Sequence, residues 1–257
     1  MIEPQPLVLT LVSRAADATV LAAAAPGRTG NVADRSGAGW RVAEARVQGG
    51  ADLTPWLEAE AAGQGVDWAI TPAANRRKRL LISDMDSTII GQECLDELAD
   101  FAGLKAEVSA ITERAMRGEL DFAGALTQRV AMLKGLKLSA LEACHTERVR
   151  LNPGAQELVA TMKAHGARAV LVSGGFRYFT SRVAAMAGFD ADRANTLIDD
   201  GAALTGEVGH PILGREAKLT ALLEETAALG LTADDALALG DGANDLDMIR
   251  AAGLGIA

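Results

Sequence analysis

Short apolar runs alternate with helix-like segments along the second half of this 257-residue chain. Apolar runs typical of buried strands cover residues 168–172 and 236–239, and helical spacing of apolar residues is found at 157–165, 176–187, 215–229 and 245–252. Strands joined by crossover helices form a parallel sheet with helices on both faces. We therefore expect an α/β core with a doubly wound parallel sheet.

The strand-like run at residues 80–83 is separated from the rest of this core by a long insertion. Residues 93–150 have the pattern of successive helices without a strand, which predicts a helical cap. Residues 195–209 hold an Asp-Gly pair between two apolar-leaning runs, which predicts a β-hairpin. Residues 76–257 are therefore expected to form one domain, with its core at 76–92 and 151–257 and the helical cap at 93–150.

Residues 1–75 have a different organisation, that of a small N-terminal α+β domain. We expect strands at 7–12, 40–47 and 66–70, helices at 15–25 and 53–62, and turns at 29–39. The basic run at 76–79 is expected to be a solvated linker. The chain ends in an apolar stretch that has the pattern of a further strand, so we expect a C-terminal segment beyond residue 257.

The composition limits the classes of partner. Hydrophobic residues make up 49% of the chain, and 25 basic against 34 acidic residues give a net charge of -9. This charge argues against nucleic acid and anionic membranes as partners, although a bound metal can still make one cleft attractive to an anion. Two isolated cysteines and no apolar run long enough to span a membrane favour a cytoplasmic protein.

Acidic side chains directly follow two of the predicted strands. Asp84 and Asp86 follow residues 80–83, and Asp241 and Asp245 follow residues 236–239. Ligands bind beyond the carboxyl ends of strands in open α/β sheets, and clustered carboxylates suit Mg²⁺. A polar turn or an aspartate that caps the next helix is the alternative for each pair. Two acidic strand ends in one sheet favour a metal-dependent site.

Two further signals lie in the same part of the chain. Ser173 and Gly174 follow the strand at 168–172, where a hydroxyl and free amides before a helix suit an anion. Lys218 lies on a predicted helix between this turn and the second acidic loop, and by itself such a lysine is usually solvated. No Gly-x-Gly-x-x-Gly or Walker lysine is present, so dinucleotide and P-loop sites are excluded.

Together these motifs resemble the signature of the haloacid dehalogenase superfamily, which has DxDx[ST], then Ser or Thr, then Lys, then an acidic pair. The segments DMDST with QEC, MRGELDF, VSGGF and GDGAND are similar to those of its phosphoserine phosphatases. The resemblance implies Mg²⁺-dependent hydrolysis of O-phosphoserine through an aspartyl-phosphate, the last step of serine biosynthesis. It also implies the superfamily's core fold with an inserted cap.

The same resemblance assigns roles to the motif residues. Asp84 is implied as the nucleophile and Asp86 as the general acid and base. Mg²⁺ would be held by Asp84, the backbone carbonyl of Asp86, and Asp241. Asp245 would support the site, and the phosphoryl group would be bound by Ser173, Gly174, Lys218 and Asn244.

In the cap, the resemblance implies that Glu93 binds the substrate ammonium and Arg129 its carboxylate. Met116 and Phe122 would form an apolar wall that excludes water. The alternatives are ordinary ones: Met116 and Phe122 as core residues, Arg129 as a surface arginine, and Glu93 as a residue favoured at a helix start by the dipole.

Two rival functions remain open from the sequence. One is another capped phosphatase or phosphotransferase of the superfamily, acting on a different small monoester or transferring phosphate to homoserine. The other is a receiver domain, which leaves Asp86 and the helical insertion without a role. The first 75 residues are similar to ACT-type or related N-terminal domains, which implies regulation or a homodimer.

Overall fold

The computed structural model describes residues 6–37, 39–48, 52–61, 64–117 and 119–257. For Met116 it describes the backbone but not the side chain. The chain divides into two compact units, residues 1–77 and 78–257. No helix among the described residues has the length and apolar character needed to cross a membrane.

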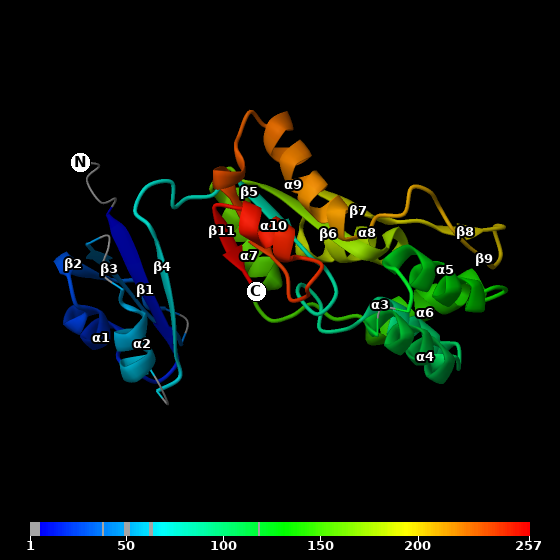
Figure 1. Cartoon of the computed structure of the whole chain (residues 1–257), viewed down its shortest axis with the longest axis horizontal. Coiled ribbons are helices and arrows are strands. Elements are labelled where there is room, and N and C mark those ends of the chain that lie inside the picture. Colours follow the sequence, from blue (N-terminus) through cyan, green and yellow to red (C-terminus); the bar gives the residue numbers. More distant parts are fainter. Residues whose placement is uncertain (1–5, 38, 49–51, 62–63, 118) are drawn as a thin grey trace. The chain divides into compact units, whose positions relative to one another are not determined.

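The N-terminal unit is an antiparallel sheet with two helices (Figure 1). Its strands lie in the order β2-β3-β1-β4. In chain order the elements are β1 (Leu7–Ser13), α1 (Ala18–Ala24), β2 (Arg28–Asp34), β3 (Arg41–Val47), α2 (Thr54–Ala61) and β4 (Val66–Pro72). Alternate residues of the strands, such as Leu9, Leu11 and Ala45, are buried in one cluster with Ala22 of α1 and Leu57 of α2.

One strand of this unit was not expected. Residues 29–39 predict turns, but β2 (Arg28–Asp34) pairs with β3. This edge strand has no alternation of apolar residues, because most of its side chains are exposed. The basic run is also less free than predicted: Arg76 pairs with Glu44, and Lys78 Nζ donates to the carbonyl of Asp234 at 2.7 Å.

The second unit holds a five-stranded parallel sheet in the order β11-β10-β5-β6-β7. The strands are β5 (Leu80–Ser83), β6 (Arg168–Phe176), β7 (Ala191–Asn195), β10 (Ala236–Leu239) and β11 (Leu254–Ile256). The helices that follow or precede them are α7 (Ala155–Ala164), α8 (Arg177–Ala187), α9 (Arg215–Ala228) and α10 (Leu246–Ala251), with a short 3-10 turn at Ala233–Asp235. The doubly wound parallel sheet predicted from the sequence is confirmed.

Both faces of the sheet are buried. Leu80 and Ile82 of β5 pack in one cluster with Leu222 of α9 and Met248 of α10. Leu81, between them in the sequence, belongs to the cluster on the opposite face, with Phe179 of α8. This explains why the core strands are continuously apolar and short.

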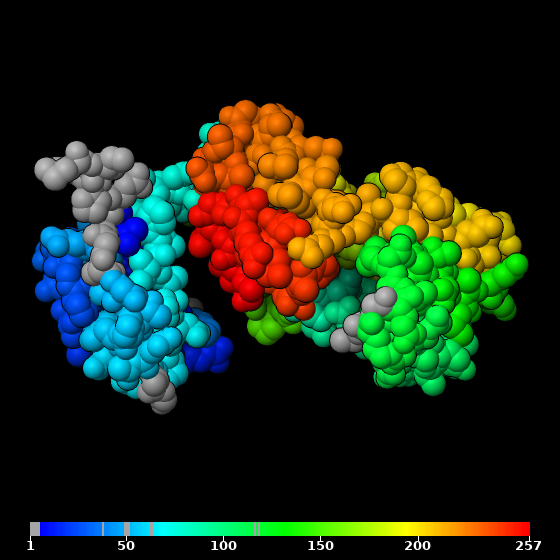
Figure 2. Space-filling model, in the orientation of Figure 1, coloured from blue at the N-terminus to red at the C-terminus, as the bar shows by residue number. Residues whose placement is uncertain are grey.

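The helical insertion after β5 consists of α3 (Cys94–Phe101), α4 (Lys105–Met116), α5 (Phe122–Met132) and α6 (Leu138–Arg148), which we call the cap. The hairpin β8 (Leu197–Asp199) and β9 (Leu204–Val208) joins it, since Gly135 N donates to Leu204 O at 2.8 Å. Figure 2 shows the green cap and the yellow hairpin as one continuous lobe.

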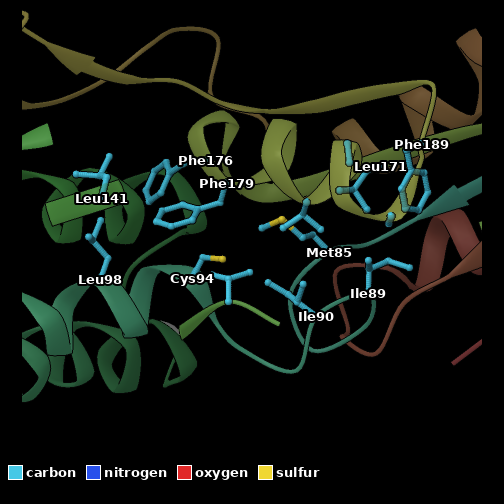
Figure 3. Packing of buried hydrophobic residues seen from close by; sticks show 14 of the residues in the cluster. Met85, Ile89, Ile90, Cys94, Leu98, Leu141, Leu171, Phe176, Phe179 and Phe189 are labelled. Atoms are coloured by element: carbon cyan, nitrogen blue, oxygen red, sulfur yellow. The ribbon is translucent and has the colours of Figure 1, made fainter. Parts of the chain in front are cut away.

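The base of the cap shares a hydrophobic cluster with the core (Figure 3). Cys94 and Leu98 of α3 and Leu141 of α6 pack with Met85 and Phe179. Side chains from both parts fill the space between them, so α3 and α6 are anchored on the sheet. Such packing fixes the position of the cap's base next to the end of β5.

Two core elements differ from the predictions. Strand β7 was not predicted, because its sequence ADRAN is polar and lies at the edge of the sheet. Strand β6 extends to Phe176, so Ser173 and Gly174 lie in extended backbone within the strand's end rather than in a turn before α8.

Candidate active site

The site lies at the carboxyl ends of three adjacent strands. Strand β5 lies between β10 and β6, so Asp84 leaves the sheet between the loop with Asp241 and the end of β6 with Ser173. The amide of Asp84 donates to the carbonyl of Leu239 at 2.9 Å, which joins the first two of these strand ends.

Lys218 of α9 lies between two carboxylates. Its Nζ is 2.7 Å from Asp84 Oδ1 and 2.5 Å from Asp245 Oδ1, and all three residues are buried. Burial raises the pKa of Asp84 to about 7, against the opposing charge of Lys218, and the neighbouring Asp245 raises it further. A lysine that sequence alone would place in solvent is therefore the cation at the centre of the site.

The loop after β10 is shaped around Asp245. The second carboxylate oxygen of Asp245 accepts from Gly242 N at 3.0 Å, and its side chain makes no capping bond to α10. A Cβ at Gly240 would lie 2.3 Å from Asp245 Cγ, so only glycine fits there. Asp245 occupies the N-cap position of α10, but its carboxylate bonds to the loop and to Lys218 instead of capping the helix. Gly240 is a site-shaping residue that the sequence analysis did not single out.

Carboxylate oxygens of Asp84, Asp241 and Asp245 lie within 4.8 Å of one another. Thr88, the last residue of the DMDST motif, donates its hydroxyl to Asp241 Oδ1 at 2.9 Å. Three convergent hard oxygen donors fit a divalent cation such as Mg²⁺. The clustered set contains Asp245, whereas the expected set had the backbone carbonyl of Asp86 as its third member.

The side chain of Asp86 has other partners. Its Oδ1 accepts from Cys94 N at 2.9 Å, and its Oδ2 accepts from Ser173 Oγ at 3.2 Å. Gly175 N in turn donates to Ser173 Oγ at 2.8 Å. Burial raises the pKa of Asp86, while the hydrogen bonds from Cys94 and Ser173 oppose that rise. The start of α3 and the end of β6 thus hold this carboxyl from two sides.

Asn195 is a second residue that the sequence analysis missed. Buried at the end of β7, it donates from Nδ2 to Gly174 O at 2.8 Å and accepts at Oδ1 from Leu213 N at 2.7 Å. It therefore holds the Ser173–Gly175 backbone against the segment that leads into α9. Nothing in the sequence pattern signals this role, because Asn195 is isolated and follows an unpredicted strand.

A cavity of about 560 Å³ lies in front of these groups, between the core and the cap. Most of the residues singled out from the sequence line it: Asp84, Asp86, Glu93, Phe122, Arg129, Ser173, Gly174, Asp241 and Asn244. Leu95 and Leu126, which were not singled out, line it too. Lys218 and Asp245 are not among its lining residues, since they are buried behind Asp84.

Phe122, at the start of α5, lies where the cap meets the core. A Cβ at Gly174 would be 3.1 Å from Phe122 Cζ, and one at Gly214 would be 3.3 Å from Phe122 Cδ1. The ring therefore lies against the backbone of two core segments, while 40% of the residue stays exposed. The side chain of Met116 lies outside the described part of the structure.

Glu93 and Arg129 place opposite charges in the cavity. Glu93 Oε1 accepts from Ser87 Oγ at 2.6 Å, and Ser87 has a left-handed backbone with φ 54°. Arg129 Nε donates to Ala125 O at 3.3 Å. Burial lowers the pKa of the Arg129 guanidinium, while Asp96 and Glu93 oppose this effect. Glu93 makes no capping bond to α3, and it lines the cavity.

Comparisons with known proteins agree with this geometry. Residues 81–250 match the family of haloacid dehalogenase-like hydrolases. A phosphoserine phosphatase of Albidiferax ferrireducens is 50% identical over 184 residues, which are 70% of this chain and 78% of that protein. The solved structure of a haloacid dehalogenase family hydrolase of Salmonella enterica has a TM-score of 0.86 and 29% identity, covering 98% of this chain and 89% of that one.

A further solved structure, of a probable phosphoserine phosphatase from Vibrio cholerae, has a TM-score of 0.78 and 32% identity. It covers 96% of this chain and 77% of that one. The family match and the level of identity are sufficient to assign membership. This chain belongs to the haloacid dehalogenase-like hydrolases and, within them, to the phosphoserine phosphatases.

Proposed function

We propose that this protein hydrolyses O-phosphoserine to serine and inorganic phosphate, with Asp84 as nucleophile and Asp86 as acid and base. One observation carries the proposal: the two aspartates of DMDST share a single cavity with an acidic and a basic cap residue, Glu93 and Arg129. A phosphorylated amino acid has three matching parts, which are a phosphate, an ammonium and a carboxylate.

In the first step, an oxygen of Asp84 attacks phosphorus and the bond from phosphorus to the serine oxygen breaks. Asp86 gives its proton to that leaving oxygen. In the second step, Asp86 takes a proton from water, the water oxygen bonds to phosphorus, and the bond from Asp84 to phosphorus breaks. The covalent carboxylate splits one slow hydrolysis into two easier steps.

Lys218 counters the charge repulsion that this attack must overcome. A phosphate monoester is close to a dianion near neutral pH, and Asp84 is also negative when it attacks. The Lys218 ammonium, 2.7 Å from Asp84 Oδ1, stabilises the negative charge there. Ser173, Gly174 and Asn244 line the cavity next to Asp84, where hydroxyl and amide groups can hold the phosphoryl oxygens.

Asp84, Asp241 and Asp245, or the backbone carbonyl of Asp86 in place of one of them, would hold Mg²⁺. When bound, this cation supplies positive charge that stabilises the phosphoryl oxygens. Thr88 fixes the orientation of Asp241 through its 2.9 Å hydrogen bond. Asp245 has the further task of holding Lys218 in line with Asp84.

The cap would select the amino-acid part of the substrate. Glu93 pairs with the ammonium and Arg129 with the carboxylate, since a charge taken into a partly dry cavity is costly unless it is paired. Phe122, and in our proposal Met116, exclude water from the reacting phosphate. For residues 1–75 we propose a regulatory or dimerising role in a cytoplasmic enzyme.

Acid quenching tests the covalent step. The full-length protein is incubated briefly with ³²P-labelled O-phosphoserine and Mg²⁺ and then quenched with acid. It should retain acid-stable label on a peptide that contains Asp84. The label should be absent after Asp84→Asn and after removal of Mg²⁺ with EDTA. Two results together would rule out Asp84 as the nucleophile. The wild-type protein would release phosphate rapidly without any trapped label, and Asp84→Asn would turn over normally.

A further inference from the structure

The N-terminal unit has a cavity of about 470 Å³ that the proposed reaction does not use. Glu44 and Arg46 of β3 line it, and they alternate with Ala43, Ala45 and Val47, which are buried in the core with α1 and α2. Successive strand residues point to opposite faces of a sheet. The cavity therefore lies on the sheet face that these helices leave uncovered.

Three arginines and one glutamate line this cavity. Glu44 accepts from Arg76 Nη2, and from Arg35 Nε at 3.3 Å. Those two arginines hold the pKa of Glu44 below its usual value, although burial opposes this. Arg46 forms no ion pair within the part of the chain that the structure describes. Counting charges, the lining carries two more positive than negative groups, in a protein whose net charge is -9.

The edge strand β2 has a β-bulge beside this cavity. Thr29 of β2 pairs with Arg46 and Ala33 pairs with Glu44, so residues 30–32 lie opposite a single residue of β3. Gly30, with φ +74°, belongs to this bulge and lines the cavity together with Asn31. Bulges of this kind re-aim the backbone and are frequent next to functional sites.

A buried hydroxyl close by has no partner. Thr71 Oγ1 is buried without a hydrogen bond among the described residues. Thr71 lies opposite Val8 in the register of β1 and β4, and Val8 lines the cavity, although Thr71 itself does not. Buried polar groups are rarely left unpaired, so this hydroxyl marks a place on the same sheet face where hydrogen bonding is incomplete.

From these observations we propose that this arginine cavity binds a small metabolite with oxyanion groups that carry two negative charges in total. Two guanidinium charges remain after Glu44 is paired, and the planar guanidinium group matches carboxylate and phosphate oxygens. Phosphate monoesters and dicarboxylates share this chemistry. All described lining residues belong to the segment from Val8 to Arg76, and none of them lines the active-site cavity.

Titration calorimetry on the full-length protein tests the proposal. Inorganic phosphate and succinate serve as dianionic probes, with acetate as the monoanion. At least one dianion should bind in a manner that Arg46→Gln weakens about tenfold, the usual effect of losing one charge-assisted contact. Only binding that depends on Arg46 is counted, because the active site also binds phosphate.

Arg41→Gln is the matched control, since Arg41 lies on the same strand at a position of the opposite face. Arg35→Gln, at an exposed side chain, is a second variant that should fold normally and weaken the same binding. Arg46-dependent binding of phosphate alone points to monoesters, and binding of succinate alone points to dicarboxylates. Absence of Arg46-dependent binding for both dianions, or equal losses in Arg46→Gln and Arg41→Gln, overturns the proposal.

Discussion

Lys218 is a buried cation whose charge is shared between Asp84 and Asp245. A buried charge without a partner is strongly destabilising, so the arrangement tolerates the loss of one carboxylate better than the loss of both. Asp245, which the loop glycines enclose, keeps Lys218 paired when Asp84 changes. The nucleophile can therefore be altered without loss of the fold.

We predict that Asp84→Asn lowers kcat by at least about a thousandfold, because an amide cannot form the phosphoenzyme. The variant should keep its circular dichroism spectrum, since Lys218 retains Asp245 as a partner. Steady-state phosphate release with saturating Mg²⁺ measures the effect. A near-normal kcat in a well-folded Asp84→Asn protein would contradict the assigned role.

We predict that Arg129→Ala loses about 2–5 kcal/mol of transition-state binding for O-phosphoserine, by analogy with truncating one partner of a buried charge pair. This corresponds to roughly 30-fold or more in kcat/KM. Phosphoethanolamine, which has no carboxylate, should lose far less. Arg129→Lys keeps the charge but not the planar fork, so it should recover only part of the loss.

Values of kcat/KM for both substrates are compared among the wild type, Arg129→Ala and Arg129→Lys. The difference between the losses for the two substrates isolates the contribution of the substrate carboxylate. Equal losses of kcat/KM for O-phosphoserine and phosphoethanolamine would make Arg129 a structural residue of the cap. An unchanged thermal midpoint in Arg129→Ala is needed as a control, because Arg129 also donates to Ala125 O.

The sequence locates the acidic residues of the site because each follows a buried strand in a short, recognisable motif. Asp84, Asp86 and Asp241 need only the strand pattern to be placed at one edge of the sheet. Asn195 and Gly240 could not be placed this way, and Asp245 was expected to support the site rather than to join the carboxylate cluster. Their roles depend on contacts between loops of separate elements, and the spacing of apolar residues along the sequence does not predict such contacts.

At the scale of elements, helix α9 is joined to the sheet by a buried glutamate. Glu225 accepts from Arg168 Nε of β6 at 2.8 Å and from Arg193 Nη2 of β7 at 2.6 Å. Burial would raise the pKa of Glu225, but the hydrogen bonds from Arg193 and Arg168 outweigh it and lower that pKa. The ionised glutamate therefore stabilises the edge of the sheet.

We predict that Glu225→Gln lowers the free energy of unfolding by about 1–3 kcal/mol near pH 7, the range for hydrogen bonds to charged groups. A depressed folded-state pKa gives stability that is present above the unfolded pKa, about 4.3, and is lost as the pH falls through the folded value. The difference between wild type and variant should therefore shrink below about pH 4.

Urea unfolding at several pH values measures this difference. Glu224→Gln is the matched control, because the neighbouring Glu224 pairs with the same Arg193 but is largely exposed, so it should cost less than about 1 kcal/mol. A loss for Glu225→Gln no larger than that of Glu224→Gln would show that the buried cluster does not stabilise the fold.

The elements that were predicted and missed differ in one physical respect. Strands β5 and β10 are apolar throughout because both faces of the sheet are covered, and they were recognised from that pattern. Strands β2 and β7 lie at sheet edges and are polar and mostly not buried, so backbone pairing rather than apolar side chains defines them. Polar edge strands lack a sequence signal, whereas the edge strands β4 and β11 contain enough apolar residues to be expected from the sequence.

At the scale of the whole molecule, the residues that line the active-site cavity all lie between Asp84 and Asn244. None of the described residues of the first compact unit, residues 1–77, is among them. We predict that a chain that starts at Lys78 keeps kcat/KM for O-phosphoserine within a few-fold of the full-length value. It should lose a regulatory response or a dimer contact instead.

Circular dichroism and light scattering on the two chains accompany this measurement. Failure of the shortened chain to fold would assign the first unit a structural role rather than a regulatory or dimerising one. Full activity together with an unchanged oligomeric state and unchanged responses would leave the unit without either proposed role.

The central claim is that this site hydrolyses a phosphorylated amino acid with the help of Mg²⁺. The most direct measurement is kcat/KM of the full-length protein for O-phosphoserine, O-phosphothreonine, phosphoethanolamine and a sugar phosphate, with Mg²⁺ and with EDTA. We predict the highest value for O-phosphoserine, at least about 30-fold above phosphoethanolamine, and loss of activity with EDTA. A sugar phosphate hydrolysed as well as O-phosphoserine, or full activity with EDTA, would contradict it.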